Sequence, residues 1–134
     1  YPNNNCLVIC VGTAITYNYI TKNRAFRGGN ITPGIHLRFK ALNDYTDKLP
    51  YVSVNGDNTL LGYDTETSIR SGVIWGIASE IDGMIDLYKK QFSEVEVMIT
   101  GGDSSIFASK IKNKTFADEN LLLKGLYTIL KYNV

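Results

Sequence analysis

Three short segments rich in β-branched and aromatic residues lie close together near the start of the chain. They span Cys6–Cys10, Ala14–Ile20 and Ala25–Ile31, and such residues favour β-strands because their side chains pack well on a pleated surface. The connections between them contain only a few residues, including Gly12 and the polar stretch Thr21–Arg24. Parallel strands need a much longer crossover, so the three segments predict consecutive antiparallel strands.

The rest of the chain alternates predicted helices and strands. Pro33-Gly34 opens a first helix, in which Arg38 and Lys40 are expected to face solvent, opposite a partial apolar stripe made of Ile35, Leu37, Phe39 and Leu42. The polar stretch Asn43–Asn58 after it is long for a loop in a compact domain, which is typical of a functional segment. The later elements are a long helix over Thr65–Gln91, a strand over Val95–Thr100, a helix from Ser104, an edge strand at Phe116–Asp118 and a helix over Asn120–Tyr132. This order predicts an α/β fold: a mixed sheet, with the three antiparallel strands first, and helices on both faces.

The predicted helix Thr65–Gln91 has two distinct faces. Apolar residues at three- and four-residue spacing define a buried face, made of Ile69, Val73, Ile77, Met84 and Tyr88. Beside it runs a small-residue stripe, made of Ser68, Gly72, Gly76, Ser79 and Gly83. Each glycine costs a helix about 1 kcal/mol relative to alanine, so close packing is expected to offset the three glycines. The packing partner is either the sheet or the same helix in a second subunit.

Composition narrows the possible functions. The 134 residues fit one domain covering residues 1–134, and a net charge of +1 argues against nucleic acid or an anionic membrane as the main partner. The longest apolar run, Cys6–Val11, is far shorter than the roughly 20 residues that span a bilayer. At about 3.3 Å per residue, Cys6 and Cys10 lie too far apart in one strand for a disulfide, which fits a reducing cytoplasm. No secretion signal is recognised, and one His with two Cys does not favour a zinc site.

Three glycine-containing turns are candidate binding segments. Val11–Ala14 joins two strands, Gly28–Gly34 leads into a helix start, and Ile99–Asp103 ends a strand at two glycines. Glycine lets backbone N–H groups approach a phosphate closely, and the last turn also precedes a helix N-terminus, where anions bind. None matches the motif of a P-loop or of a dinucleotide fold, and tight chain packing also explains each turn. His36 is expected to face solvent on the first helix and has no evident Ser or Cys partner, so no hydrolase triad is predicted.

Eight segments occur together in an order that one enzyme family shares. They are Leu7–Thr16, Arg27–Gly34, Arg38–Leu42, Leu49-Pro50, Gly62–Thr67, Ser71-Gly72, Ile99–Asp103 and Leu123–Leu126. In this order and approximate spacing they closely resemble the type III pantothenate kinases, in particular the version found in Bacteroidetes. One such motif is weak evidence, whereas eight in register from Leu7 to the end of the chain are specific.

The resemblance implies a fold and an activity. The family belongs to the acetate-and-sugar-kinase, heat-shock-70 and actin superfamily, whose two ribonuclease H-like domains close over ATP. The predicted order of strands and helices fits one of these domains, the C-terminal one. Family members transfer the γ-phosphoryl group of ATP to the hydroxyl of pantothenate, the first step toward coenzyme A. They use ATP with Mg²⁺ and a monovalent cation, K⁺ or NH₄⁺, and they are cytoplasmic homodimers with the active site near the subunit interface.

Individual site residues follow from the resemblance, position by position. Thr13 corresponds to the ATP-contacting Thr of the family's Asp-x-Gly-Thr segment, with Gly12 beside it. Gly101 and Gly102 correspond to the Thr-Gly-Gly turn on the nucleotide side of the family's active site. Thr65 corresponds to the Thr that contacts pantothenate, which the family supplies across the dimer.

The sequence departs from the family pattern at two positions. Cys10 stands where the family has the Asp that holds the monovalent cation, and a soft thiol suits K⁺ poorly. Asn18 stands where the family usually has a second Asp, so the amide keeps an acceptor but loses the charge. Both changes remove an anion near the expected phosphate and cation sites.

The family's general-base Asp and its Asp-x-Gly-Asn-Thr phosphate loop do not occur in these 134 residues. No catalytic residue is therefore assigned in this chain, and phosphoryl transfer is expected only with the missing N-terminal half. A second hypothesis is a catalytically degenerate domain that keeps nucleotide binding, and a third is a dimerisation module built on the small-residue stripe. The matching motifs favour the enzyme, whereas Cys10 and Asn18 favour the degenerate domain.

Overall fold

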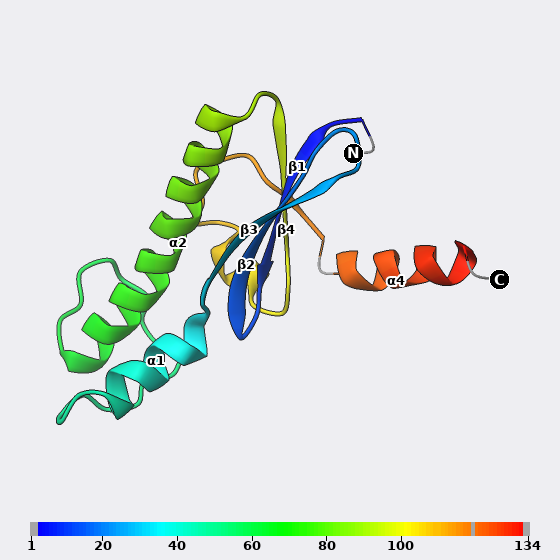
Figure 1. Cartoon of the computed structure of the whole chain (residues 1–134). Helices are drawn as coiled ribbons and strands as arrows, with labels where there is room; N and C mark the ends of the chain where they lie inside the picture. Colours follow the sequence, from blue (N-terminus) through cyan, green and yellow to red (C-terminus); the bar gives the residue numbers. More distant parts are fainter. Residues whose placement is uncertain (1–2, 119, 133–134) are drawn as a thin grey trace.

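The computed structural model describes residues 3–118 and 120–132 (Figure 1). Its elements are β1 (Asn5–Val11), β2 (Ala14–Ile20), β3 (Phe26–Pro33), α1 (Ile35–Asp44), α2 (Thr65–Gln91), β4 (Val95–Thr100), α3 (Ser104–Phe107), β5 (Phe116–Ala117) and α4 (Leu121–Tyr132). The predicted bounds of α2 and β4 are confirmed to the residue. Within the described ranges, no helix is both long enough and apolar enough to cross a membrane.

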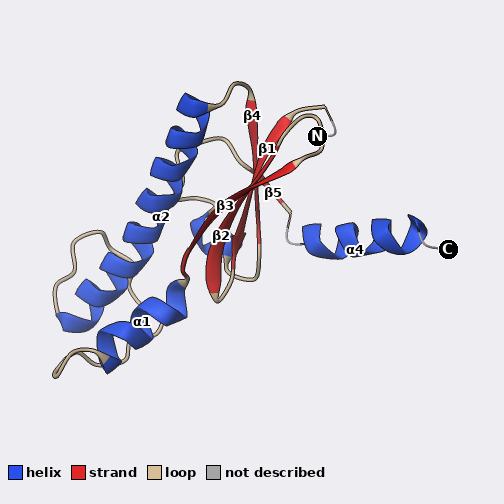
Figure 2. Ribbon diagram, viewed as in Figure 1, coloured by secondary structure: helices blue, strands red, loops and turns tan. Residues whose placement is uncertain are grey.

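Five strands form one sheet in the order β3-β2-β1-β4-β5 (Figure 2). β1 pairs with β2, and β2 with β3, in antiparallel orientation, whereas β4 is parallel to β1 and β5 is parallel to β4. The mixed sheet with three antiparallel strands first is therefore confirmed. Because β1 and β4 are parallel neighbours, their carboxyl ends at Val11 and Thr100 lie at the same edge of the sheet. This edge carries the turns at Gly12 and at Gly101-Gly102, and the third glycine segment ends beside them at Gly34.

The core lies between the sheet and α2. Side chains alternate between the two faces of a strand, and Leu7, Ile9 and Val11 of β1 all belong to the buried cluster that includes α2. On the helix, Ile77 and Ile81 have no exposed surface at all. Burying one such side chain fully is worth roughly 1.5–3 kcal/mol. This contact fixes α2, and therefore the residues at its N-terminus, relative to the sheet.

A capping box fixes the start of α2. The Asp64 carboxylate accepts a hydrogen bond from the Thr67 N–H at 2.8 Å, and Thr67 Oγ1 accepts one from the Asp64 N–H at 3.1 Å. These bonds satisfy backbone donors that a helix leaves free around its first turn, where Glu66 adds a favourable negative charge. The helix therefore begins where the sequence predicts, at Thr65.

The small-residue stripe of α2 is exposed. A Cβ atom added at Gly72, Gly76 or Gly83 would meet no other atom within 4 Å, and Ser68 and Ser79 are exposed as well. The sheet is therefore excluded as the packing partner in the part of the chain that the structure describes. Packing within that part does not offset the cost of the three glycines.

Residues 45–64 connect α1 to α2 and are held in place by Arg70. The Arg70 side chain donates from Nε to Ser53 O at 2.9 Å and from Nη1 to Asp57 O at 3.3 Å. Its Nη2 pairs with Glu66 at 2.7 Å, and the residue is only 1% exposed. The long predicted loop is thus an ordered part of the fold. Sequence reasoning missed this buried arginine, although the four-residue spacing from Glu66 was a usable signal.

The last helix, α4, lies apart from the sheet and the other helices (Figure 1). The helix begins after β5 and extends away from the sheet (Figure 1), and none of its described side chains is buried. Asp118 fixes its start, because the Asp118 N–H donates to Ile99 O at 3.1 Å and Lys124 pairs with the Asp118 carboxylate at 2.7 Å. In the described residues, α4 therefore does not pack on the sheet.

Candidate functional site

The turn after β1 and the turn after β4 meet at the carboxyl edge of the sheet. The Asp103 N–H donates to Val11 O at 3.0 Å. Gly101 has φ +105°, and a Cβ atom there would lie 2.4 Å from Val11 O. Both facts make glycine necessary at position 101, because other residues rarely adopt this conformation and none fits the space. The structure therefore brings the candidate residues Gly12 and Thr13 next to Gly101.

The third glycine segment reaches the same place from the other side. The Gly34 N–H donates to Thr13 O at 2.9 Å, and a Cβ atom on Gly34 would lie 2.1 Å from Gly12 O. The turn at Gly12 and Thr13 is therefore packed between the end of β4 and the start of α1. All three predicted glycine segments converge, although their separation in the sequence gives no sign of it.

The exposed surface of this edge presents polar groups that suit an anion. Thr13 and Gly102 are both exposed, and a Cβ atom at Gly102 would meet nothing within 4 Å. Sterics therefore leave open space beside Gly102, in contrast to Gly101. The helix that follows, α3, has only four residues, so it contributes no helix dipole of consequence. What the edge offers is the Thr13 hydroxyl and the exposed backbone at Thr13 and Gly102.

Cys10 and Asn18, the two departures from the family pattern, lie close together on β1 and β2. Cys10 is paired in register with Thr16, and the Asn18 side-chain amide donates to Thr16 Oγ1 and to Val8 O, both at 3.2 Å. Cys10 is half-buried. Among the described residues, no group of three or more His, Cys, Asp and Glu side chains is placed to hold a metal ion. Cys10, Thr16 and Asn18 thus offer a thiol, a hydroxyl and an amide, and none of these is a charged oxygen ligand.

Thr65 lies in a different part of the molecule. It is the first residue of α2 and lines a cavity of about 900 Å³ between α1, residues 45–64 and the N-terminal half of α2. Arg38 and Leu42 of α1 form the opposite wall, and Ser68 and Gly72 continue the lining along α2. The residues of the glycine turns do not line this cavity. The structure therefore separates the predicted pantothenate residue from the predicted ATP residues within this chain.

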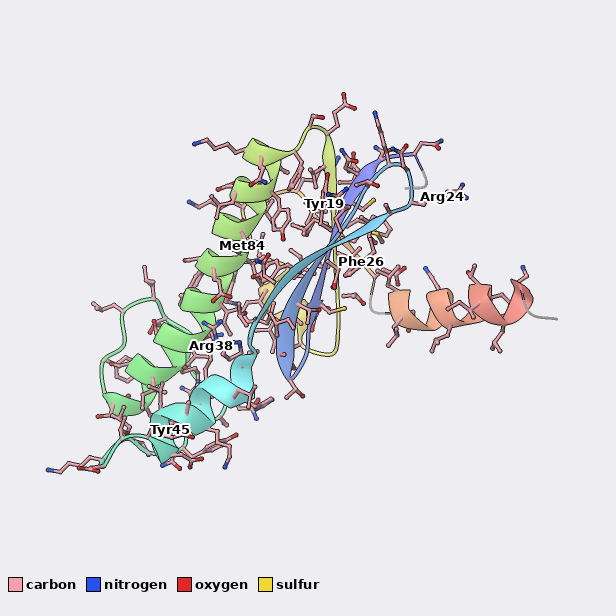
Figure 3. The ribbon with its side chains drawn as sticks, viewed as in Figure 1. Tyr19, Arg24, Phe26, Arg38, Tyr45 and Met84 are labelled. Carbon is pink, nitrogen blue, oxygen red and sulfur yellow. The ribbon has the colours of Figure 1, made fainter. Side chains whose placement is uncertain are left out.

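Arg38 ties the two helices at this cavity to the sheet, and Figure 3 shows it where α1 meets α2. Arg38 pairs with Glu80 of α2 at 2.6 Å and donates from Nε to Pro33 O at 2.9 Å. Thr32 Oγ1 also donates to Glu80, at 2.7 Å. The sequence interpretation placed Arg38 toward solvent, which is wrong: its partner Glu80 is too distant in the chain for spacing to indicate the pair. His36, predicted to face solvent, is exposed.

Tyr17 of β2 is a buried polar group near this pair. Its side chain has no exposed surface, and its hydroxyl lacks a hydrogen-bond partner within the described structure. Burial raises the pKa of Tyr17, and the negative charge of Glu80 raises it further. The residue therefore stays a neutral phenol.

Comparison with known sequences identifies relatives along the whole chain. The model of the type III pantothenate kinase family matches residues 1–87. The chain is 49% identical to the type III pantothenate kinase of Phocaeicola vulgatus over 132 residues, which are 98% of this chain and 54% of that enzyme. It is 44% identical to that of Christiangramia forsetii over 133 residues, covering 99% of this chain and 55% of that enzyme. The chain thus spans about half the length of the curated relatives that it matches.

Solved structures show the same fold. A crystal structure of a conserved Baf family protein from Campylobacter jejuni matches 99% of this chain and 60% of its own, with a TM-score of 0.70 and 25% identity. The ethanolamine utilization protein EutJ from Carboxydothermus hydrogenoformans matches 90% of this chain with a TM-score of 0.51 and 16% identity, and shares the fold alone. The ribonuclease H-like fold implied by the resemblance is confirmed. From the family match and the identities along its length, the chain belongs to the type III pantothenate kinase family.

Proposed function

We propose that this chain forms the C-terminal ribonuclease H-like half of a pantothenate kinase, which transfers the γ-phosphoryl group of ATP to the hydroxyl of pantothenate. The observation that carries the proposal is the convergence of the Gly12-Thr13 and Gly101-Gly102 turns, in a chain that is 49% identical to a pantothenate kinase over 132 residues. Because the chain spans about half of such relatives, the activity is proposed for the complete kinase and not for these residues alone.

The ATP side of the reaction is assigned to the glycine turns. The Thr13 hydroxyl and the backbone around Gly102 are exposed at the sheet edge, where they contact phosphate oxygens. The Asp103–Val11 hydrogen bond and the steric fit of Gly101 hold the turn in one conformation. Donors that are fixed in advance stabilise a developing charge without reorganising during the reaction.

The pantothenate side is assigned to Thr65 and the cavity beside it. A volume of about 900 Å³ lies in the range of sites for small molecules. Thr65 and the glycine turns serve one reaction if the cavity of one subunit meets the nucleotide edge of the other. The proposal therefore includes a homodimer, in which the active site forms near the subunit interface, and it retains the cytoplasmic location implied by the family.

The exposed surface around the N-terminus of α2 supports the homodimer. The small-residue stripe has open space above Gly72 and Gly76, which permits close approach of a second helix. Large apolar side chains lie exposed nearby on residues 45–64, with Leu60 73% and Leu61 85% exposed. Sedimentation of wild type and Gly76→Leu tests this, and we expect a wild-type dimer that the bulkier side chain weakens. A monomeric wild type at high concentration contradicts the dimer.

The residues of this chain bear differently on the two cations that the family uses, Mg²⁺ and a monovalent cation. Mg²⁺ enters with ATP, whose phosphates it binds, and no ligand for it is assigned in this chain. The residues at the expected monovalent site do not fit K⁺ or NH₄⁺, because Cys10 offers a thiol where a hard cation needs oxygen. The same substitution, together with Asn18, favours the second candidate: a domain of the same fold that binds nucleotide or dimerises but has lost catalysis.

A coupled ADP-release assay separates these candidates. The chain alone, with ATP, Mg²⁺, K⁺ and pantothenate, is expected to show no pantothenate-dependent turnover. A fusion to the part of the Phocaeicola vulgatus kinase that lies outside the matched region supplies the missing segments. Turnover by the fusion supports the kinase. A folded fusion that shows no turnover, but gains activity from Cys10→Asp, identifies a degenerate domain. Turnover by the chain alone contradicts the proposal.

Two substitutions in the fusion test the site assignments against each other. Thr13→Val is expected to raise KM for ATP at least tenfold and to leave KM for pantothenate nearly unchanged. Thr65→Ala is expected to do the reverse, so each variant is the control for the other. Equal effects of both variants on both substrates contradict the separation of the two sites.

A further inference from the structure

Arg38 is the only cation among the described residues that line the cavity beside Thr65. It lies where α1 meets α2 (Figure 3), and 22% of its side chain is exposed although it pairs with Glu80 at 2.6 Å. The acidic residue of the lining, Asp64, already accepts hydrogen bonds from the N–H and the hydroxyl of Thr67 in the capping box. Arg38 is therefore the group in this cavity that suits an anionic ligand.

The Arg38 guanidinium has hydrogen-bond donors to spare. A guanidinium carries five N–H groups in one plane. Here Nε donates to Pro33 O at 2.9 Å and Nη2 donates to Glu80 at 2.6 Å. Nη1 has no hydrogen-bond partner among the described residues, and it is not one of the buried polar atoms that lack a partner. It is therefore open to solvent, on a side chain that lines the cavity.

Contacts on two sides orient the guanidinium in advance. Pro33 ends β3 and Glu80 belongs to α2, so Arg38 is held from the sheet and from the helix. Thr32 Oγ1 donates to the second oxygen of Glu80 at 2.7 Å, which fixes that carboxylate in turn. Glu80 itself does not line the cavity. A charged donor that is already oriented loses little conformational entropy when it binds a ligand, so the ion pair prepares Arg38 for one.

The rest of the lining suits the other groups of pantothenate. This substrate carries a carboxylate at one end and, at the other, the hydroxyl that receives the phosphoryl group, with two methyl groups, a second hydroxyl and an amide between them. The lining supplies apolar side chains, from Ala41, Leu42, Leu49, Ile69 and Val73, and hydroxyl groups, from Tyr63, Thr65 and Ser68. Sites for small molecules combine an apolar wall with a few polar groups in this way. One cation is then left for the one carboxylate.

The position of the cavity favours a carboxylate over a phosphate of ATP. The turns assigned to ATP, Gly12-Thr13 and Gly101-Gly102, do not line it. Arginine binds a carboxylate strongly because the hydrogen bonds are charge-assisted and two of them fit side by side. The anionic end of the smaller substrate is therefore the ligand that matches Arg38.

We propose that Arg38 is a specificity-determining residue that binds the carboxylate of pantothenate in the cavity beside Thr65. The inference rests on the proposed function and deepens it, because it names the group by which the site selects an anionic substrate. The carboxylate lies at the opposite end of pantothenate from the reacting hydroxyl. Arg38 therefore contributes to substrate binding and not to the chemical step.

A pair of substrates tests the role of Arg38. They are pantothenate and its alcohol analogue, in which a primary alcohol replaces the carboxylate and the reacting hydroxyl is unchanged. In the fusion to the unmatched part of the Phocaeicola vulgatus kinase, ADP release is expected to give a KM for pantothenate about tenfold or more below that for the analogue. Arg38→Met is expected to remove this difference by raising KM for pantothenate alone, with kcat nearly unchanged.

Two control variants separate binding of the substrate from support of the fold. Glu80→Gln breaks the same ion pair but keeps the cation, so it is expected to change both KM values alike and to preserve their ratio. Lys40→Met removes an exposed cation of the same helix that does not line the cavity, and no change is expected. If Arg38→Met does not fold, the double variant Arg38→Met/Glu80→Met replaces the ion pair by an apolar contact, with the same expected loss of preference.

The results that overturn the inference concern the ratio of the two KM values. An equal rise of both values in Arg38→Met means that Arg38 only supports the fold. Loss of the preference in Glu80→Gln as well assigns the selection to the shape of the cavity. A wild-type fusion that uses both compounds equally well shows that the carboxylate is not recognised.

Binding distinguishes a failure of this inference from a failure of the proposed function. If the fusion shows no turnover, calorimetric Kd values for the two compounds replace the KM values. A preference for pantothenate that depends on Arg38, without turnover, supports the inference and contradicts the kinase assignment. Turnover with a ratio that does not depend on Arg38 supports the kinase and overturns the inference, and binding of neither compound contradicts both.

Discussion

The helices α2 and α4 both have one apolar side, but only the apolar side of α2 packs against the rest of the described chain. Ile77 and Ile81 of α2 are fully buried against the core, whereas Leu126 and Leu130 of α4 are 50% and 63% exposed. The difference shows that an amphipathic pattern identifies which side of a helix needs a partner. It does not reveal whether that partner lies in the same stretch of sequence.

The largest expected effect tests the burial of α2 directly. Ile81→Ala is expected to lower the free energy of unfolding by about 2–5 kcal/mol, because it leaves a cavity in a packed core. Leu130→Ala in α4 is expected to change it by less than about 0.5 kcal/mol, as at other exposed positions. Urea unfolding followed by circular dichroism measures both. Equal losses would mean that α4 is packed in solution.

The second prediction concerns the buried charge that anchors residues 45–64. Arg70→Met is expected to cost about 1–3 kcal/mol, because the carbonyl groups of Ser53 and Asp57 lose their donors. It should also expose residues 45–64 to proteolysis. Lys124→Met removes the ion pair between the exposed Lys124 side chain of α4 and Asp118 and serves as the matched control, with an unchanged unfolding midpoint expected. Protection from proteolysis in Arg70→Met would show that other contacts hold the segment.

The third prediction compares single hydroxyl groups in the two helices. Thr67→Val keeps the shape of the side chain but leaves the N–H groups of Tyr63 and Asp64 without their acceptor. A loss of about 1 kcal/mol is expected. Thr128→Val in α4 removes a bond to its own helix and is expected to have no measurable effect on global unfolding. A similar loss from both substitutions contradicts the difference between the helices.

The smallest expected effect is a pH dependence carried by Asp82 of α2. Burial opposes ionisation of this carboxyl, but hydrogen bonds from Lys112 and Asn113 outweigh burial and lower its pKa. Its contribution to stability is therefore complete above the pKa of the unfolded chain and is lost as pH falls through the lower, folded pKa. Urea unfolding of wild type and Asp82→Asn from pH 6 to pH 3 measures it.

The pH series has a matched comparison in α4. Hydrogen bonds from Lys124 and Asn120 also lower the pKa of Asp118, yet Asp118→Asn is expected to leave global unfolding unchanged, because α4 does not pack on the core. We expect the difference between wild type and Asp82→Asn to shrink toward low pH. A difference that stays constant over this range would show that Asp82 acts through packing and not through its charge.

The sequence predicts what depends on local chemistry. The bounds of α2 follow from its apolar spacing and from capping by Asp64, and the antiparallel start of the sheet follows from short connections. The Arg38–Glu80 pair was missed because the fold, and not the spacing, brings the partners together. Leu37, expected on the apolar stripe of α1, is 42% exposed, because the core side of this helix is filled by Ile35 and Phe39.

For the candidate site too, the sequence indicates the local features but not the contacts that the fold creates. Glycines at positions 12, 34 and 101 were recognised in the sequence as special, but their mutual contact is visible only in the folded chain. The separation of Thr65 from these turns is indicated only by the resemblance, which implies that Thr65 is supplied across the dimer, because spacing in the sequence does not reveal it. The roles of Thr65, Thr13 and the glycines remain predictions until the variants are measured.

The contact of Gly34 with Gly12 and Thr13 has a mechanical consequence. It joins two backbones with no side chain between them, so a shift of the turn is passed to α1 without being absorbed by rotamer changes. The helix is ten residues long, about 15 Å, and residues on its far half line the cavity beside Thr65. It is therefore a stiff connection between the turn at Gly12-Thr13 and the cavity, and binding at the turn is expected to alter the width of the cavity.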